Sequence, residues 1–136
     1  MDIAVFEKQG KVPVTVLKVD GQLDGQNYQT LIAKAKDLFQ EGARDFILDL
    51  SDLTYISSAG LVALHSVALL VKGEDLPDTD QGWSTYRSLG RTSSAGLQHH
   101  IKLLSPREEV RSVLDMVGFA NVFEIFTDLD EAVKSF

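Results

Sequence analysis

The chain contains no cysteine, which removes disulfides, thiolate nucleophiles and cysteine-ligated zinc sites from consideration. The same absence fits a reducing compartment, so we expect a cytoplasmic protein. The 13 basic residues form no cluster and are outnumbered by 20 acidic ones, giving a formal net charge of -7. Because binding to nucleic acid or to an anionic membrane usually needs a basic patch, we expect neither.

Long apolar runs and glycine-rich phosphate loops are also missing. No segment approaches the roughly 18 consecutive apolar residues of a membrane span, so we expect no membrane insertion. The first residues lack the charged and apolar regions of a signal peptide. The two common nucleotide-binding glycine signatures and the Gly-x-Ser-x-Gly signature of hydrolases do not occur. We therefore expect no cofactor and no metal.

What remains is an ordinary globular chain of 136 residues, 44% of them apolar, which fits one domain with one core. Apolar periodicity and turn signals, among them Asp20-Gly21 and Asp24-Gly25, divide it into strands and helices. In chain order we expect strands over 3–6 and 12–19, a helix over 28–39, a strand over 46–50, a helix over 60–71, a strand over 101–104, a helix begun by Ser105-Pro106 and ended by Gly118, a strand over 122–126 and a helix from Asp128. This ββαβα-insertion-βαβα order predicts an α/β fold, a mixed and mostly parallel sheet of about five strands with helices packed against it.

The insertion, at about 73–97, interrupts the alternation with acidic residues, then serines and glycines around Trp83 and Tyr86. A loop this long is uncommon in a compact domain, and we expect it to be disordered or partly ordered. Its two aromatic residues could anchor a partner or pack back onto the domain. The run Ser57–Leu61 recurs within it at 93–97 without matching flanks, which we interpret as coincidence or local duplication.

Two serines stand where the strand at 46–50 leads into the apolar helix. The first backbone N–H groups of a helix lack helical partners and carry partial positive charge, so Ser57 or Ser58 could cap the helix. The same position would also accommodate a phosphoryl group on a serine. The residues alone leave both interpretations open.

Several segments together resemble a STAS domain of the anti-sigma factor antagonist type. They are the run 48–61 that ends in Tyr-Ile-Ser-Ser-Ala-Gly-Leu, the upstream Asp-Gly-Gln-Leu-Asp at 20–24, and the segments 101–106, 113–119 and 123–126. Everything except the insertion is covered. The resemblance implies a STAS-like fold and a regulatory binding module without catalytic activity.

The resemblance also implies a partner and a switch. In this family an anti-sigma factor that is also a serine kinase phosphorylates the antagonist, which binds that partner when unphosphorylated and releases it when phosphorylated. By position the phosphorylated residue is Ser58, with Ser57 as the less favoured choice, although the family commonly has Asp at the position of Ser57 and Ser or Thr at that of Ala59. The implied docking surface comprises Asp24, Gly25, Ser57, Ser58, Ala59 and Gly60.

The alternative is a constitutive scaffold, or a subunit of a transporter- or stressosome-associated complex, that uses the same surface without phosphorylation. In either role we expect a monomer when free, because the acidic chain has no heptad pattern.

Catalytic and metal-binding alternatives have weaker support in the sequence. A hydrolase would need His65 beside Ser58, although both lie on one predicted helix. The adjacent His99 and His100 should point to opposite faces of a strand, so we interpret them as solvated. A receiver-like cluster of carboxylates stays open as an alternative, and its members would be Asp20, Asp24, Asp49 and Asp52.

Overall fold

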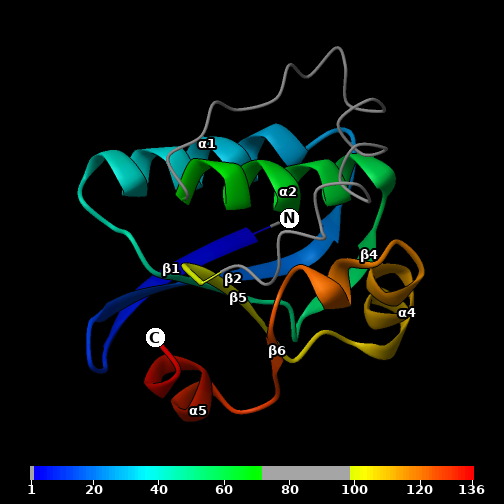
Figure 1. Ribbon diagram of the computed structural model, residues 1–136. Helices are drawn as coiled ribbons and strands as arrows, with labels where there is room; N and C mark the ends of the chain where they lie inside the picture. The colour runs from blue at the N-terminus through cyan, green and yellow to red at the C-terminus, as the bar shows by residue number, and fades with distance from the viewer. Residues whose placement is uncertain (1, 72–98) are drawn as a thin grey trace.

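The computed structural model describes residues 2–71 and 99–136, and within them a six-stranded mixed sheet lies between helices (Figure 1). The insertion expected at 73–97, with Trp83, Tyr86 and the repeated Ser-Ser-Ala-Gly-Leu run, lies outside the described residues.

The sheet begins with an antiparallel hairpin and continues in parallel. Strands β1 (Asp2–Gln9) and β2 (Pro13–Leu23) form the hairpin, as predicted. The order across the sheet is β1-β2-β3-β5-β6, and the parallel strands are β3 (Phe46–Asp49), β5 (Ile101–Leu104) and β6 (Ile125–Phe126). The predicted α/β fold with a mixed, mostly parallel sheet is confirmed.

Helices cover both faces of this sheet. Helices α1 (Tyr28–Gln40) and α2 (Ser58–Val71) lie side by side on one face, and the short α5 (Leu129–Lys134) lies on the other (Figure 1). Helix α4 (Glu108–Met116) packs against β4 (Leu53–Ile56) and is followed by the 3-10 helix η3 (Phe119–Asn121).

The central strand β3 is buried on both faces, as its continuous apolar run predicted. Phe46 and Leu48 belong to the larger core, which lies under α1 and α2, whereas Ile47 belongs to the smaller core under α5. All three side chains are 0% exposed. Burial of this kind contributes about 2 kcal/mol for each large apolar side chain, so β3 anchors the elements on both faces.

Strand β2 does not end at Asp20-Gly21, and the predicted turn there is wrong. Gly21 has a φ of +95°, which side chains rarely tolerate, and the register of the sheet shifts between Gly21 and Gln22. Beyond this shift β2 leaves β3 and continues in parallel with β4, a strand that the sequence pattern did not reveal. Local turn chemistry was overridden by a pairing with residues about 30 positions away.

The predicted start of α4 at Ser105 is also wrong. Ser105 has a φ of +49°, its N–H donates to the carbonyl of Phe126 at 2.7 Å, and its hydroxyl donates to the carbonyl of Thr127 at 3.3 Å. Ser105 therefore extends the contact between β5 and β6, and the helix begins at Glu108 instead. The strand predicted over 122–126 shortens to its last two residues for a related reason, because η3 precedes it and Val122 and Phe123 turn into the core.

Other helix boundaries follow their local signals. The Asp128 carboxylate accepts a hydrogen bond from the N–H of Glu131 at 3.2 Å and caps α5. Gly118, with a φ of +83°, follows α4 in the left-handed conformation that ends many helices.

Candidate functional site

The pairing of β2 with β4 brings the two segments of the predicted docking surface together. Leu23, the last residue of β2, lies opposite Ile56, the last residue of β4. The ladder extends one step further, because the Ser57 N–H donates to the Leu23 carbonyl at 2.9 Å. The loop that starts at Asp24 and the helix that starts at Ser58 therefore leave the sheet from adjacent points.

Gly60 allows this close approach. A Cβ atom built on Gly60 would lie 2.8 Å from the backbone oxygen of Leu23 and 2.6 Å from Cγ1 of Ile56. Carbon atoms in proteins essentially never approach so closely, so any larger residue would push the first turn of α2 away from the end of β2. The glycine thus sets the spacing between the two segments of the surface.

The two neighbouring serines have different environments. Ser57 caps α2, since its Oγ accepts from the Gly60 N–H at 3.3 Å and its carbonyl accepts from the Leu61 N–H at 3.0 Å. Ser58 is the first residue of α2 and is exposed. No other residue in the described parts of the chain hydrogen-bonds its hydroxyl. Of the two hydroxyls, that of Ser58 is the one more open to a reagent from solvent.

The loop beside Ser58 is held by its own hydrogen bonds. The Asp24 carboxylate accepts from the Gln26 N–H at 3.0 Å, and the Asp24 N–H donates to Oδ1 of Asn27 at 2.9 Å. The amide of Asn27 in turn donates to the carbonyl of Gln22 at 2.7 Å. Gly25 lies at the exposed tip, where a Cβ atom added to it would have no neighbouring atom within 4 Å. The loop is a preformed surface, which lowers the entropic cost of binding a partner.

Tyr55 belongs to the run that carries the family resemblance, but it was not among the residues of the implied docking surface. Tyr55 lies on β4 two positions before Ser57, and it is 51% exposed although it is a large aromatic residue. Exposed tyrosines are common anchors at protein interfaces. The exposure of Tyr55 follows from the pairing of β4 with β2, which turns its side chain outward.

Three carboxylates of the receiver-like alternative, those of Asp52, Asp49 and Asp20, act on Lys18. Asp52 Oδ2 lies 2.9 Å from Nζ of Lys18, and this hydrogen bond and charge raise the pKa of Lys18. Asp49 accepts from the N–H of Ser51 at 3.0 Å. Among the described residues, no group of three or more His, Cys, Asp or Glu side chains is placed to hold a metal ion.

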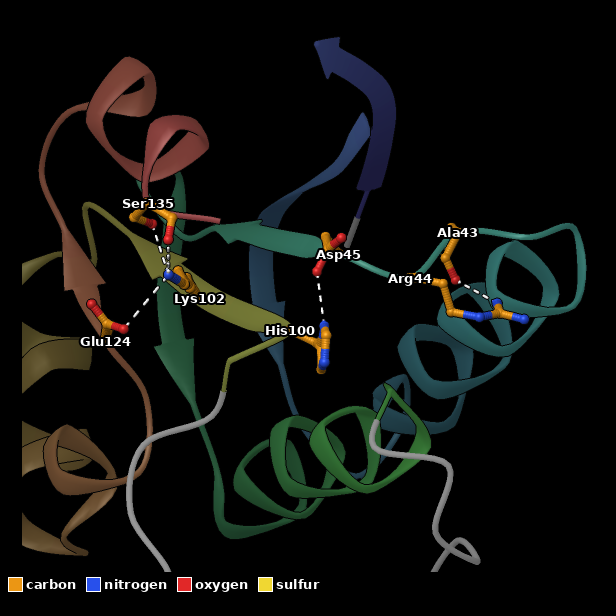
Figure 2. A network of polar contacts seen from close by, with 7 residues as sticks. All are labelled: Ala43, Arg44, Asp45, His100, Lys102, Glu124 and Ser135. Carbon is orange, nitrogen blue, oxygen red and sulfur yellow. Dashed lines mark hydrogen bonds and ion pairs between the residues drawn. The ribbon is translucent and has the colours of Figure 1, made fainter. Parts of the chain in front are cut away.

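The histidines do not complete a hydrolytic site with Ser58. His100 lies near β5, and its Nδ1 is 2.9 Å from Oδ1 of Asp45, so His100 is not simply solvated as expected, although it is exposed (Figure 2). His65 follows Ser58 on the same helix, about two turns and roughly 10 Å further along its axis. That separation is too large for the direct hydrogen bond that a serine nucleophile and its base would share.

A second polar cluster lies between β5 and α5. Lys102 is only 3% exposed, and its Nζ donates to Oγ of Ser135 at 2.7 Å and to the Ser135 carbonyl at 3.2 Å (Figure 2). Its charge lies 3.5 Å from Glu124 Oε1 and 4.5 Å from the centre of the Phe136 ring. These contacts satisfy a buried ammonium group and fasten the end of α5 to the sheet.

No helix in the described residues is both long and apolar enough to cross a membrane.

Comparison with solved structures finds the same fold in known proteins. A candidate anti-sigma factor antagonist from Thermotoga maritima is 22% identical, with a TM-score of 0.64 over 88% of this chain and 83% of that one. An anti-sigma factor antagonist from Mycobacterium paratuberculosis is 18% identical, with a TM-score of 0.63 over 98% of this chain and 93% of that one. The Bacillus protein SpoIIAA in its phosphorylated form is 19% identical, with a TM-score of 0.52 over 96% of both chains. At these identities the likeness establishes the fold.

A search of curated proteins finds no match. The model of the STAS domain family, however, matches residues 5–75, a segment that includes β2, β4, the Asp24 loop and all of α2. The match covers more than half of the chain and contains both segments of the surface around Ser58. The chain belongs to the STAS domain family.

Proposed function

We propose that this protein is an anti-sigma factor antagonist, a cytoplasmic regulatory module without catalytic activity. Unphosphorylated, it binds an anti-sigma factor that is also a serine kinase, and phosphorylation of Ser58 releases that partner. The observation that carries the proposal is the exposed Ser58 hydroxyl at the start of α2, beside the preformed Asp24 loop.

The physical basis of the switch is a change of charge on a docking surface. A phosphoryl group adds about 1.5 to 2 negative charges at neutral pH. The first N–H groups of α2 and the helix dipole tolerate that charge, so the fold is expected to stay intact. A partner that docks over Ser58 and Asp24 would instead have to desolvate the phosphate and face two negative groups, which weakens binding.

The solved structures support this proposal by analogy. Two of the neighbours are described as anti-sigma factor antagonists, and SpoIIAA has been solved in an unphosphorylated and a phosphorylated form. The shared fold supports, by analogy, a role for phosphorylation in this chain as well.

The test is a kinase and binding assay with purified components. Each serine kinase of the histidine-kinase-like ATPase fold from the native host is incubated with ATP and with wild type, Ser57→Ala or Ser58→Ala. We expect one kinase to modify wild type and Ser57→Ala but not Ser58→Ala. In calorimetry, Ser58→Glu should bind that kinase at least about tenfold more weakly than Ser58→Ala. Equal binding by the two variants would contradict the switch.

A second candidate function is a constitutive scaffold or complex subunit that uses the same surface. The observation that favours it is the identity of the flanking residues, since Ser57 serves as a helix cap and Ala59 cannot be phosphorylated. This role predicts that a partner binds wild type, Ser58→Ala and Ser58→Glu with similar affinity, and that no host kinase modifies the chain.

A further inference from the structure

In the part of the chain that the structure describes, the outermost strand of the sheet has an unpaired edge. β1 comes first in the strand order and, among the described strands, pairs with β2 alone. Its register runs without a bulge from the pair Asp2–Asp20 to the pair Gln9–Pro13, and β1 itself contains no proline. Bulges and prolines are devices that block edge-to-edge pairing, and β1 has neither. Its outer edge therefore presents a regular row of backbone donors and acceptors that no other described strand pairs.

The side chains of this edge strand are unusually exposed and include two large apolar residues. Val5 is 38% exposed and Phe6 is 37% exposed, and both lie at the middle of the strand. Val5 pairs with Leu17 on the face of α1 and α2, while Phe6 pairs with Val16 on the face of α5. Because the two side chains project from opposite faces, a further strand alongside β1 would cover both at once.

We propose that two copies of this chain associate through β1, with their β1 strands antiparallel around a twofold axis at Val5. Such pairing closes on itself and extends the sheet across the two molecules. In this register Asp2 of each copy lies opposite Lys8 of the other, so the interface contains two pairs of opposite charges. The remaining cross-strand pairs are Val5 with Val5, Ile3 with Glu7, and Ala4 with Phe6.

The charges favour a second copy as the occupant and fix the register. Within one molecule Asp2 lies opposite Asp20, an unfavourable juxtaposition of like charges. Lys8 of a second copy would lie on the free side of Asp2 and offset that repulsion. Moving the axis to Phe6 would place Lys8 opposite Ala4 and remove both ion pairs. Shifting the pairing by one residue would place side chains from opposite faces of β1 opposite each other. The twofold axis keeps each face of the sheet on its own side, so it excludes that register.

The association should be reversible and depend on concentration. A single pair of eight-residue strands buries less than the roughly 1,600 Å² of a standard stable interface. Each copy also carries a net charge of -7, which opposes association. The dilute protein is then the monomer expected from the sequence, and the dimer forms as concentration rises. The proposal does not rest on the function assigned to Ser58.

Sedimentation equilibrium of the full chain from about 10 µM to about 1 mM tests the proposal. The mass of the wild type should rise from 15.0 kDa towards twice that value. Asp2→Lys and Lys8→Asp each place like charges at both ends of the interface and should raise the dissociation constant about tenfold or more. An equimolar mixture of these two variants restores opposite charges at both ends, so it should dimerise again. Lys36→Asp, an exposed charge reversal on α1, is the matched control and should behave as the wild type does apart from its added negative charge.

Two results would overturn the proposal. One is a mass of 15.0 kDa for the wild type at every concentration. The other is a dimer that neither charge reversal weakens, or that the mixture fails to restore, because either outcome means that the copies meet elsewhere. Circular dichroism and thermal unfolding of each variant verify the fold, which exposed substitutions at Asp2 and Lys8 should preserve.

Discussion

Replacing Gly60 with alanine should loosen the surface around Ser58, because the added methyl group has no room. It would lie 2.8 Å from the Leu23 carbonyl oxygen and 2.6 Å from Cγ1 of Ile56. The side chain of Ile56 can rotate. The Leu23 carbonyl, however, belongs to the β2–β4 ladder and accepts a hydrogen bond from the Ser57 N–H, so moving it would weaken that bond. The start of α2 must therefore shift outward.

The size of the effect follows from two opposing contributions. Overpacking of this kind typically costs about 1–3 kcal/mol. Alanine is a better helix former than glycine by up to about 1 kcal/mol, which offsets part of that cost. We expect a net loss of about 1–2 kcal/mol in the free energy of unfolding, or a melting temperature lower by about 3–6 °C.

The assay is urea denaturation of Gly60→Ala beside Gly25→Ala. Gly25 has no atom within 4 Å of its added Cβ, so its replacement should change stability by less than about 0.5 kcal/mol. Hydrogen exchange should also quicken in Gly60→Ala at the Ser57 N–H, whose hydrogen bond to Leu23 the shift would strain. Equal stability of the two variants would refute the close approach of α2 to β2.

Three further outcomes follow from the hydrogen bonds of the fold. Lys102→Ala should lower the free energy of unfolding by about 3 kcal/mol in urea denaturation, and Lys102→Met by clearly less, because Met keeps the buried stem; equal losses would contradict this account. Asp52 raises the pKa of Lys18, so the pair stabilises the fold at any pH below 10.5, the ordinary pKa of lysine. That stabilisation is lost as the pH rises through the raised pKa. Nuclear magnetic resonance titration should find a lower Lys18 pKa in Asp52→Asn, and an unchanged value would rule the pair out. Asp128→Ala should cost about 1 kcal/mol and speed hydrogen exchange in α5, whereas unchanged exchange would show that the cap is dispensable.

The elements predicted well from the sequence are those whose signals are local and strong. The apolar run at 46–48 is typical of a strand covered on both faces, and Asp128 had both the capping side chain and the following acidic residues of a helix start. These features depend on residues close together in the chain, so the sequence alone contained the information.

The predictions that were wrong concern residues whose conformation depends on contacts with segments far away in the chain. Asp20-Gly21 is typical of a turn, yet the pairing of β2 with β4 uses the glycine to change register instead. Ser105 is typical of a helix cap, yet the carbonyls of Phe126 and Thr127 engage it first. β6 has only two residues, and the two central residues of β4 are exposed, so neither strand indicates such pairings by its own pattern.

At the candidate site, too, some features were visible in the sequence and others needed the structure. The segment around Ser58 and its family resemblance were visible in the sequence, whereas the assignment of the cap to Ser57 needed the 3.3 Å contact with the Gly60 N–H. The exposure of Tyr55 likewise depends on which face of β4 meets the core. The sequence proposed the surface, and the geometry distinguished its residues.

Phosphosite mapping tests the central claim most directly. Intact-mass analysis and site mapping would be applied to the protein purified from its native host under growth and stress conditions, as wild type, Ser57→Ala and Ser58→Ala. We predict a phosphoryl group on Ser58 that persists in Ser57→Ala and disappears in Ser58→Ala. A chain that is unmodified under every condition, or that carries its phosphate on Ser57, would contradict the switch.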